Sequence, residues 1–186
     1  MRNSAEVTNA LTKFKSIDAP YEYLFDDVVK LASLAIAAKQ VVLSFIEEEK
    51  QQIKAKLGVD CSLKEFPLSE SIDEEVVHSN RTVIKCDLSK EKMCFKNALI
   101  WPNGNCIDNY IGVPIKACDD SIIGVLAAMN YDSKALTQST LEMLGTLAKQ
   151  VVSILEINTN NKAIISVQND TDVDSKINLN RLSYYR

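Results

Sequence analysis

The sequence predicts an α+β fold in which helices pack against one central antiparallel sheet. Two observations favour this class: helical and strand-like apolar periods occur in the same chain, and two buried strand patterns follow one another between residues 109 and 130. A chain of 186 residues, 46% of them hydrophobic, is long enough for one domain of roughly 150 residues with a real core. We expect one domain at residues 19–158 with a tail on either side.

The central pair of strands is predicted from its apolar pattern. Ile111, Val113 and Ile115 alternate on one face, whereas residues 122–129 are apolar on both faces, as in a middle strand that is covered on each side. Asp119-Asp120-Ser121 between them supplies turn residues. The two strands are therefore expected to form an antiparallel hairpin.

The chain before this hairpin begins with a polar stretch. Residues 1–18 are predicted to be a leader or a short amphipathic helix. Asp18-Ala19-Pro20 is a helix start signal, and apolar residues then recur at helical spacing to about residue 38. The predicted apolar face consists of Leu24, Phe25, Val28, Leu31, Ala32 and Ala35.

A first hairpin is predicted directly after this helix. Residues 41–46 are β-branched and aromatic, which is typical of a core strand, and the acids at 47–49 end it at a solvated turn. From residue 51 to residue 57 polar and apolar side chains alternate. This pattern predicts a half-exposed strand near the sheet edge, with Ile53, Ala55 and Leu57 facing the core.

A short helix is predicted next, because Ser71-x-x-Glu74 matches a capping box, and it should run to about His78. Residues 82–88 form the next expected strand. Residues 89–108 have no clear period and are predicted to be a long loop, a type of segment that often carries function in compact domains.

The last helix is predicted to begin after Thr137 as N-cap and to reach at least Asn158. Its main apolar face consists of Leu144, Leu147, Ala148, Val151 and Leu155, and Met143, Val152 and Ile154 widen it. So wide a face can bury one side on the sheet and another against a second copy, which predicts a homodimer. Residues 159–186 are rich in Asn, Asp, Ser and Thr and are expected to be disordered.

Composition argues against several partners. A net charge of −4 without a Lys/Arg cluster disfavours nucleic acid and anionic membranes, and no apolar run is long enough to span a bilayer. The first residues do not resemble a signal peptide, so a cytoplasmic location with reduced cysteines is expected. Cys61, Cys86, Cys94, Cys106 and Cys118 lack a Cys-x-x-Cys spacing and only His78 could join them, so no metal site is predicted.

Over about residues 20–157 the sequence resembles the GAF domain family, in particular GAF domains attached to bacterial sensor kinases and cyclic-dinucleotide enzymes. The resemblance rests on the order and spacing of several stretches together. They are Leu31-Ala32, Val42 to Glu49, Ile53 to Gly58, Val83 to Leu88, Phe95 with Asn97, Tyr110 to Ile115, Ile123 to Leu126, and Leu144 to Val151.

The resemblance implies a sheet with the first and last helices on one face and a ligand pocket on the other, beneath residues 69–79 and 89–108. It also implies a non-enzymatic sensory or regulatory domain that binds a small molecule, dimerises through its terminal helices and signals through a partner protein. The expected ligand-binding residues are Ser71, Phe95, Trp101, Tyr110 and Asn130. Neither the ligand nor any cofactor is identified by the sequence, and each of the three aromatic residues, taken singly, fits better a loop that is pinned over its own apolar cluster.

Three other readings stay open. His78 lies in the part of the fold where haem-binding relatives have a histidine, but it also fits an exposed helix end. Cys61 and Cys106 fall near two of the three cysteine positions of the GAF-fold enzyme free methionine-R-sulfoxide reductase, whereas residues 69–71 lack the middle one. The domain could also be a scaffold that binds no ligand and acts through protein contacts alone.

Overall fold

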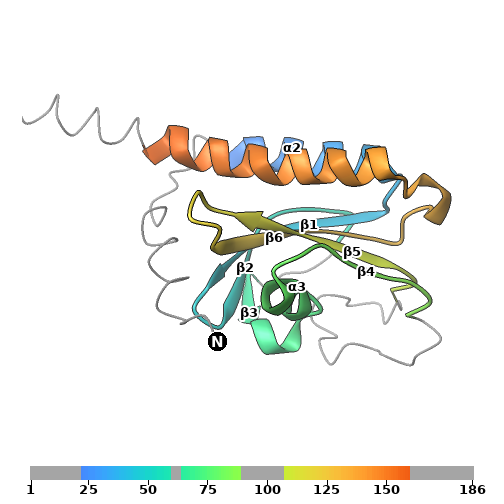
Figure 1. Ribbon diagram of the computed structural model, residues 1–186, viewed down its shortest axis with the longest axis horizontal. Coiled ribbons are helices and arrows are strands. Elements are labelled where there is room, and N and C mark those ends of the chain that lie inside the picture. Colours follow the sequence, from blue (N-terminus) through green and yellow to red (C-terminus); the bar gives the residue numbers. More distant parts are fainter. Residues whose placement is uncertain (1–21, 60–63, 89–106, 160–186) are drawn as a thin grey trace, which may run out of the picture.

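The computed structural model describes residues 22–59, 64–88 and 107–159, and within them the α+β prediction is confirmed. A six-stranded antiparallel sheet has the strand order β3-β2-β1-β6-β5-β4 (Figure 1). Its strands are β1 (Gln40–Glu47), β2 (Lys50–Leu57), β3 (Glu65–Pro67), β4 (Val83–Lys85), β5 (Tyr110–Lys116) and β6 (Ile122–Met129).

The predicted central hairpin is confirmed as β5 and β6. Strand β6 lies between β1 and β5, and all eight of its residues are buried, as its unbroken apolar run predicts. The turn uses the expected acids: Asp120 has a positive φ of 65°, and Asp119 Oδ1 accepts a hydrogen bond from the Ser121 backbone N–H at 3.1 Å.

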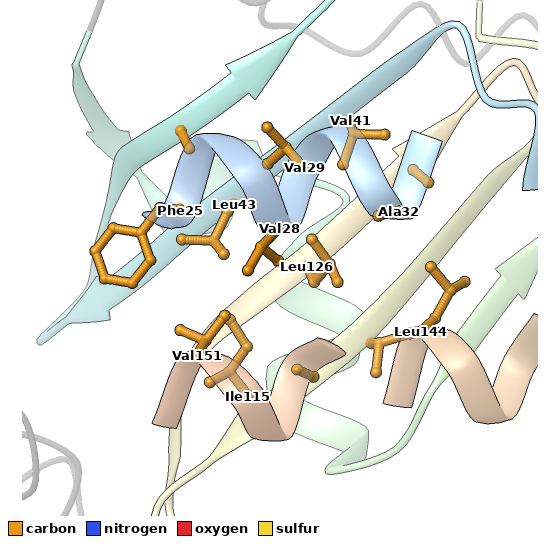
Figure 2. Close-up of a cluster of buried hydrophobic side chains, with 14 of the residues drawn as sticks. Phe25, Val28, Val29, Ala32, Val41, Leu43, Ile115, Leu126, Leu144 and Val151 are labelled. Carbon is orange, nitrogen blue, oxygen red and sulfur yellow. The ribbon is translucent and has the colours of Figure 1, made fainter. Parts of the chain in front are cut away.

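Helices cover the two faces of the sheet unequally. Helix α2 (Glu22–Ile36) and the helix at residues 138–159 lie side by side on one face, whereas α3 (Asp73–Ser79) lies on the other (Figure 1). The larger apolar core lies between the sheet and the two long helices (Figure 2). In it Phe25 packs edge-on against Phe45, with ring centroids 5.6 Å apart. A smaller core lies between the sheet and α3.

The buried face of α2 differs from the predicted one. Its fully buried positions are Phe25, Val28, Val29, Ala32 and Ile36. Leu31, which was expected on this face, is 53% exposed, and Leu34 is 79% exposed. The side of α2 that contacts the sheet is the one that carries Phe25, Ala32 and Ile36. Leu31 lies on another side of the helix and points away from the core.

The first hairpin is confirmed, but its second strand is not uniformly oriented. A register shift between the pairs of Leu43 and Ser44 leaves Lys54 as an extra residue in β2. Ala55 and Leu57 then contact the core under the long helices, whereas Ile53 contacts the core under α3. The prediction that these three residues share one face is therefore wrong, because a bulge reverses the alternation.

The short helix after Ser71 is confirmed as α3. A 3₁₀ turn, η2 (Leu68–Glu70), precedes it, and Ser71 Oγ accepts a hydrogen bond from the Asp73 N–H at 3.1 Å. The strand predicted at 82–88 is shorter and pairs only as β4. Edge strand β3 was not predicted, because three residues are too few for a visible period.

The start of the 138–159 helix is confirmed at Thr137. Thr137 Oγ1 accepts from the Thr140 N–H at 3.2 Å, and Thr140 Oγ1 accepts from the Thr137 N–H at 2.8 Å. A further 3₁₀ turn, η3 (Ser133–Ala135), leads into it. No helix in the described ranges is long and apolar enough to cross a membrane. The predictions for residues 1–18, for the loop before Ile107 and for the tail after Thr159 lie outside the described residues.

Candidate functional site

A small cavity of about 30 Å³ lies between the sheet and the segment that contains η2 and α3. Most of its wall is apolar: Val42, Ile53, Phe66, Ile72, Ile107, Ala127 and Met129. Its polar lining residues are Gln51, Glu70, Ser71 and Asp73. An apolar hollow with a few convergent polar groups is the usual form of a small-molecule site.

A buried polar cluster connects α3 to the sheet beside this cavity. Asp73 is 4% exposed, Gln51 1% and Tyr110 0%. The Tyr110 hydroxyl donates to Asp73 Oδ1 at 2.5 Å, and Gln51 Nε2 donates to Asp73 Oδ2 and, at 2.7 Å, to Ser44 Oγ. Asp73 therefore joins the first turn of α3 to β5 and β2.

Burial shifts the titration of both acidic groups in the cluster. Loss of hydration raises the pKa of Asp73, and the hydrogen bonds from Tyr110, Gln51 and Ser44 oppose this effect. Loss of hydration and the neighbouring Asp73 carboxyl raise the pKa of Tyr110 well above its ordinary value. Tyr110 therefore keeps its proton at neutral pH and acts as a donor to Asp73.

One polar atom in this cluster is left without a partner. Both N–H bonds of the Gln51 amide are directed at Ser44 and Asp73, while Gln51 Oε1 is buried and has no hydrogen-bond partner within the described ranges. Leaving a buried acceptor unpaired costs about 1–3 kcal/mol. Gln51 as a residue also lines the cavity, so the unpaired amide oxygen belongs to the same cluster of side chains as the cavity wall.

Gly112 makes room for this arrangement on β5. A Cβ atom at Gly112 would overlap the Tyr110 hydroxyl and would lie 2.6 Å from Val76 Cγ2 on α3. The absence of a side chain thus lets the Tyr110 ring lie along its own strand and reach Asp73. Glycine inside a strand often marks such a close approach.

A second, polar cleft of about 530 Å³ lies at the end of β6. Asn130, a predicted ligand residue, lines it, but its side-chain amide is already used: Nδ2 donates to Gln40 Oε1 and Oδ1 accepts from the Asp108 N–H, each at 2.8 Å. Asn109 exchanges two hydrogen bonds with the Tyr131 backbone. These amides hold together the ends of β1, β5 and β6.

The predicted ligand-binding residues are thus distributed over different places. Ser71 lines the cavity. Tyr110 does not line it, but its hydroxyl donates a hydrogen bond to Asp73, which does. Asn130 lines the polar cleft. Phe95 and Trp101 lie outside the described residues. The sequence analysis did not identify Gln51 and Asp73, the two most buried polar residues of the cavity wall. The one feature of the sequence that could have pointed to them is Gly112, a glycine inside a strand, which marks the close approach of Tyr110 and hence its contact with Asp73.

The described residues include no cluster of three His, Cys, Asp or Glu side chains that could hold a metal ion. His78 is exposed in the last turn of α3. Cys86 and Cys118 are exposed, and Cys118 Sγ donates to Glu156 Oε1 at 2.8 Å, whereas Cys61, Cys94 and Cys106 lie outside the described ranges. The described part of the site therefore offers hydrogen bonding and shape, and no pair of nucleophile and base.

The structure is an α+β domain in which two long helices cover one face of an antiparallel sheet and a short helix lies beside a small cavity on the other. Residues 21–155 match the GAF domain family, and the chain belongs to that family. No curated protein matches the chain in a sequence comparison.

Solved structures agree with this assignment at the level of the fold. The GAF domain of a Coxiella burnetii phosphoenolpyruvate-protein phosphotransferase superimposes with a TM-score of 0.63 at 14% identity, covering 87% of this chain and 97% of that one. The corresponding Acinetobacter domain gives 0.61 at 17% identity, covering 84% and 95%. Type II free methionine-R-sulfoxide reductase from Thermoplasma acidophilum gives 0.59 at 16% identity, covering 73% and 92%. GAF domains of phosphotransferases and a free methionine-R-sulfoxide reductase thus share this fold.

Proposed function

We propose that the chain is a cytoplasmic regulatory GAF domain that binds a small molecule in the cavity beneath α3 and passes the signal on as a homodimer or through a partner protein. The observation that carries the proposal is the largely apolar cavity beneath α3, whose few polar lining residues include Gln51 and Asp73. Because α3 is held to the sheet through Asp73, a ligand in contact with this cluster would alter how α3 is held. Ligand binding would in this way change the position or the stability of α3.

Native mass spectrometry of the full chain as purified from cells tests the binding proposal, together with an absorbance spectrum. We expect a mass increment that is lost on denaturation. The variant Ala127→Val adds bulk to the cavity wall and should lose the increment, whereas Ala117→Val, at a partly buried position outside the wall, should retain it. Retention of the increment in Ala127→Val would place the ligand elsewhere, and a protein without any increment in repeated preparations would contradict tight binding.

The dimer proposal is supported by a stripe on one flank of the 138–159 helix. Met143, Leu147, Gln150, Ile154 and Ile157 follow one another at spacings of four and three residues, the repeat of a helix that pairs with another helix. Met143 is 47% and Ile157 55% exposed, so the stripe keeps apolar surface uncovered. A second copy of the chain presents the same stripe and can cover it symmetrically.

Sedimentation velocity on the full chain at micromolar concentration tests this interface, and wild type is expected to be a dimer. Ile157→Lys places a charge in the stripe and should weaken the dimer roughly tenfold or more, since a buried unpaired charge is costly in an interface. Ile84→Lys is the matched control, because Ile84 is a comparably exposed isoleucine (42%) on edge strand β4. A monomeric wild type, or equal effects of both variants, would refute the stripe as the interface.

Non-enzymatic function is part of the proposal and has its own measurement. The reductase-like alternative predicts turnover of free methionine sulfoxide that depends on Cys106. We expect no turnover by the wild-type chain in the presence of a thiol reductant. Turnover that is abolished by Cys106→Ser would replace the regulatory proposal by an enzymatic one.

A further inference from the structure

A β-bulge in the sheet lies beside the buried polar cluster formed by Asp73, Tyr110, Gln51 and Ser44, which is called the Asp73 cluster below. Lys54 is the extra residue of β2 at the register shift next to Ser44. Gln51 belongs to the same strand as Lys54, and Ser44 lies opposite the bulge on β1. The cluster and the bulge therefore share one short stretch of the sheet.

On the α3 side of the sheet, hydrogen bonds connect α3 to β1 at the bulge. Gln51 Nε2 donates to Asp73 Oδ2 and, at 2.7 Å, to Ser44 Oγ. Ser44 is completely buried, and its Oγ donates to the Val125 carbonyl oxygen on β6 at 3.4 Å. A displacement of Asp73 on α3 therefore acts on Ser44 through the Gln51 amide.

On the opposite side of the sheet, the same stretch of β1 holds an aromatic contact with α2. Phe45 follows Ser44 directly, so its side chain points to the other face, where it packs edge-on against Phe25 of α2. The ammonium group of the bulge residue Lys54 lies 5.9 Å from the centroid of the Phe45 ring. The bulge residue and α2 thus contact the same phenylalanine ring.

Close packing against β6 prevents this stretch of β1 from moving independently. A Cβ atom on Gly124 would overlap the Ser44 carbonyl oxygen and would lie 2.9 Å from Phe45 Cδ1. Phe25 is completely buried, and Phe45 is 4% exposed. In so densely packed an interior a backbone shift displaces the adjoining side chains, and residues joined by such a shift are coupled in stability.

We propose that the bulge at Lys54 couples the position of α3 to that of α2 and so carries a change at the cavity to the opposite face of the sheet. The inference rests on the proposed function, because it names the route by which binding in the cavity reaches a long helix. Loosening of the Asp73 cluster shifts Ser44, and this shift changes the contact of Phe45 with Phe25. Helix α2 then responds although α3 lies on the other face of the sheet (Figure 1).

Amide hydrogen exchange of the full chain tests this coupling without any ligand. Gln51→Met retains the approximate length of the side chain and removes its hydrogen bonds to Ser44 and Asp73. We expect protection at residues 26–29 of α2 to fall by about threefold or more beyond the fall in the 138–159 helix. An equal fall in both helices would mean general destabilisation and would overturn the inference.

Val83→Ala is the matched control, because it weakens the core between the sheet and α3 but removes no hydrogen bond of the Asp73 cluster. Val83 belongs to that core, is 7% exposed and lies on edge strand β4. Its truncation should lower protection in α2 and in the 138–159 helix by the same factor. A selective fall in α2 in this variant would show that the Asp73 cluster is not the source of the effect and would overturn the inference.

A double-mutant cycle measures the same coupling in the equilibrium constant for unfolding. Phe25→Leu removes the ring contact with Phe45, and its effect should change by about threefold or more when Gln51→Met is also present. Leu144→Ala, in the same core but on the 138–159 helix, should combine additively with Gln51→Met. Additive effects for both pairs would overturn the inference.

Deletion of Lys54 tests the bulge itself. Ile53 and Ala55 then become consecutive residues, which in a regular strand point to opposite faces, as these two do in the bulged strand. Both cores should be retained, and Gln51→Met in the shortened chain should lower protection in the two long helices equally. A persisting selective fall in α2 would overturn the role of the bulge. The exchange and cycle experiments decide the inference even if the shortened chain does not fold.

The two proposals fail differently. If native mass spectrometry detects a small molecule that Ala127→Val excludes, but α2 does not respond to Gln51→Met, the proposed function stands and the bulge is not the route. If α2 responds to Gln51→Met but no small molecule is detected, the coupling is confirmed and the binding proposal is wrong.

Discussion

Tyr110→Phe is expected to lower the free energy of unfolding by about 1–3 kcal/mol, the usual cost of leaving a buried acceptor without its hydrogen-bond partner. The Tyr110 hydroxyl donates to Asp73 Oδ1 at 2.5 Å, and both side chains are buried. Because phenylalanine retains the ring and its packing, the decrease in the free energy of unfolding measures the contribution of the hydrogen bond. Chemical denaturation of the full chain gives the free energy.

This loss should depend on pH in a defined direction. The pKa of Asp73 is raised in the folded chain by loss of hydration, so the folded state binds this proton more tightly than the unfolded state. The stability that Asp73 contributes is therefore present below its unfolded pKa and falls as the pH rises through the folded pKa. Since the Tyr110 hydrogen bond lowers the pKa of Asp73, Tyr110→Phe should raise that pKa further. The destabilisation should be smallest at acid pH, where Asp73 is neutral, and should grow as the pH rises through the folded pKa of Asp73.

Tyr131→Phe provides the matched control. Tyr131 is also a buried tyrosine, and burial raises its pKa to about 12, but its hydroxyl has no hydrogen-bond partner among the described residues. Removing this hydroxyl should change stability by no more than about 0.5 kcal/mol, or should raise it, because an unpaired buried group is removed. Equal decreases in the free energy of unfolding in the two variants would show that the hydrogen bond between Tyr110 and Asp73 does not contribute measurably to stability.

The fold could be predicted because its signals are local. The eight apolar residues of β6, the Asp119-Asp120 turn and the threonine cap of the 138–159 helix each act within a few residues of chain. Their order along the chain limited the topology to one antiparallel sheet with helices at both ends. The face of α2 was less well predicted, because Val29 and Leu31 are equally apolar and only the position of the sheet decides which is buried.

The site could not be predicted because its polar groups meet through tertiary structure. Asp73 is 22 residues from Gln51 and 37 from Tyr110. In the sequence Asp73 lies between Ser71 and Glu74 at the start of a helix, where acidic side chains are usually exposed, and Gln51 is a polar residue at the first position of an alternating strand. Neither position predicts that the two side chains meet in a buried cluster. The bulge at Lys54 decides which face Gln51 occupies, and a bulge leaves no mark in a pattern of period two.

Gly112→Ala is expected to destabilise the chain by about 3 kcal/mol, through overpacking together with loss of the Tyr110 hydrogen bond. The added Cβ would overlap the Tyr110 hydroxyl and approach Val76 Cγ2 to 2.6 Å. Tyr110 is completely buried and Val76 belongs to α3, so relief of the overlap must move the hydroxyl away from Asp73 or move α3 away from the sheet. Denaturation gives the size of the effect, and amide hydrogen exchange in α3 reports loosening of the helix.

Two comparisons separate this mechanism from a general intolerance of change. Gly145→Ala, in the 138–159 helix, adds a Cβ that meets nothing within 4 Å, and it should raise stability by about 0.5–1 kcal/mol because alanine favours the helix more than glycine does. In a Tyr110→Phe background the added Cβ no longer meets a hydroxyl, so Gly112→Ala should cost measurably less than in wild type. Additive effects of the two substitutions would mean that Gly112 does not serve to admit the Tyr110 hydroxyl. A smaller combined loss would show that Gly112 and Tyr110 act together, with the glycine making room for the hydroxyl that holds α3 to the sheet through Asp73.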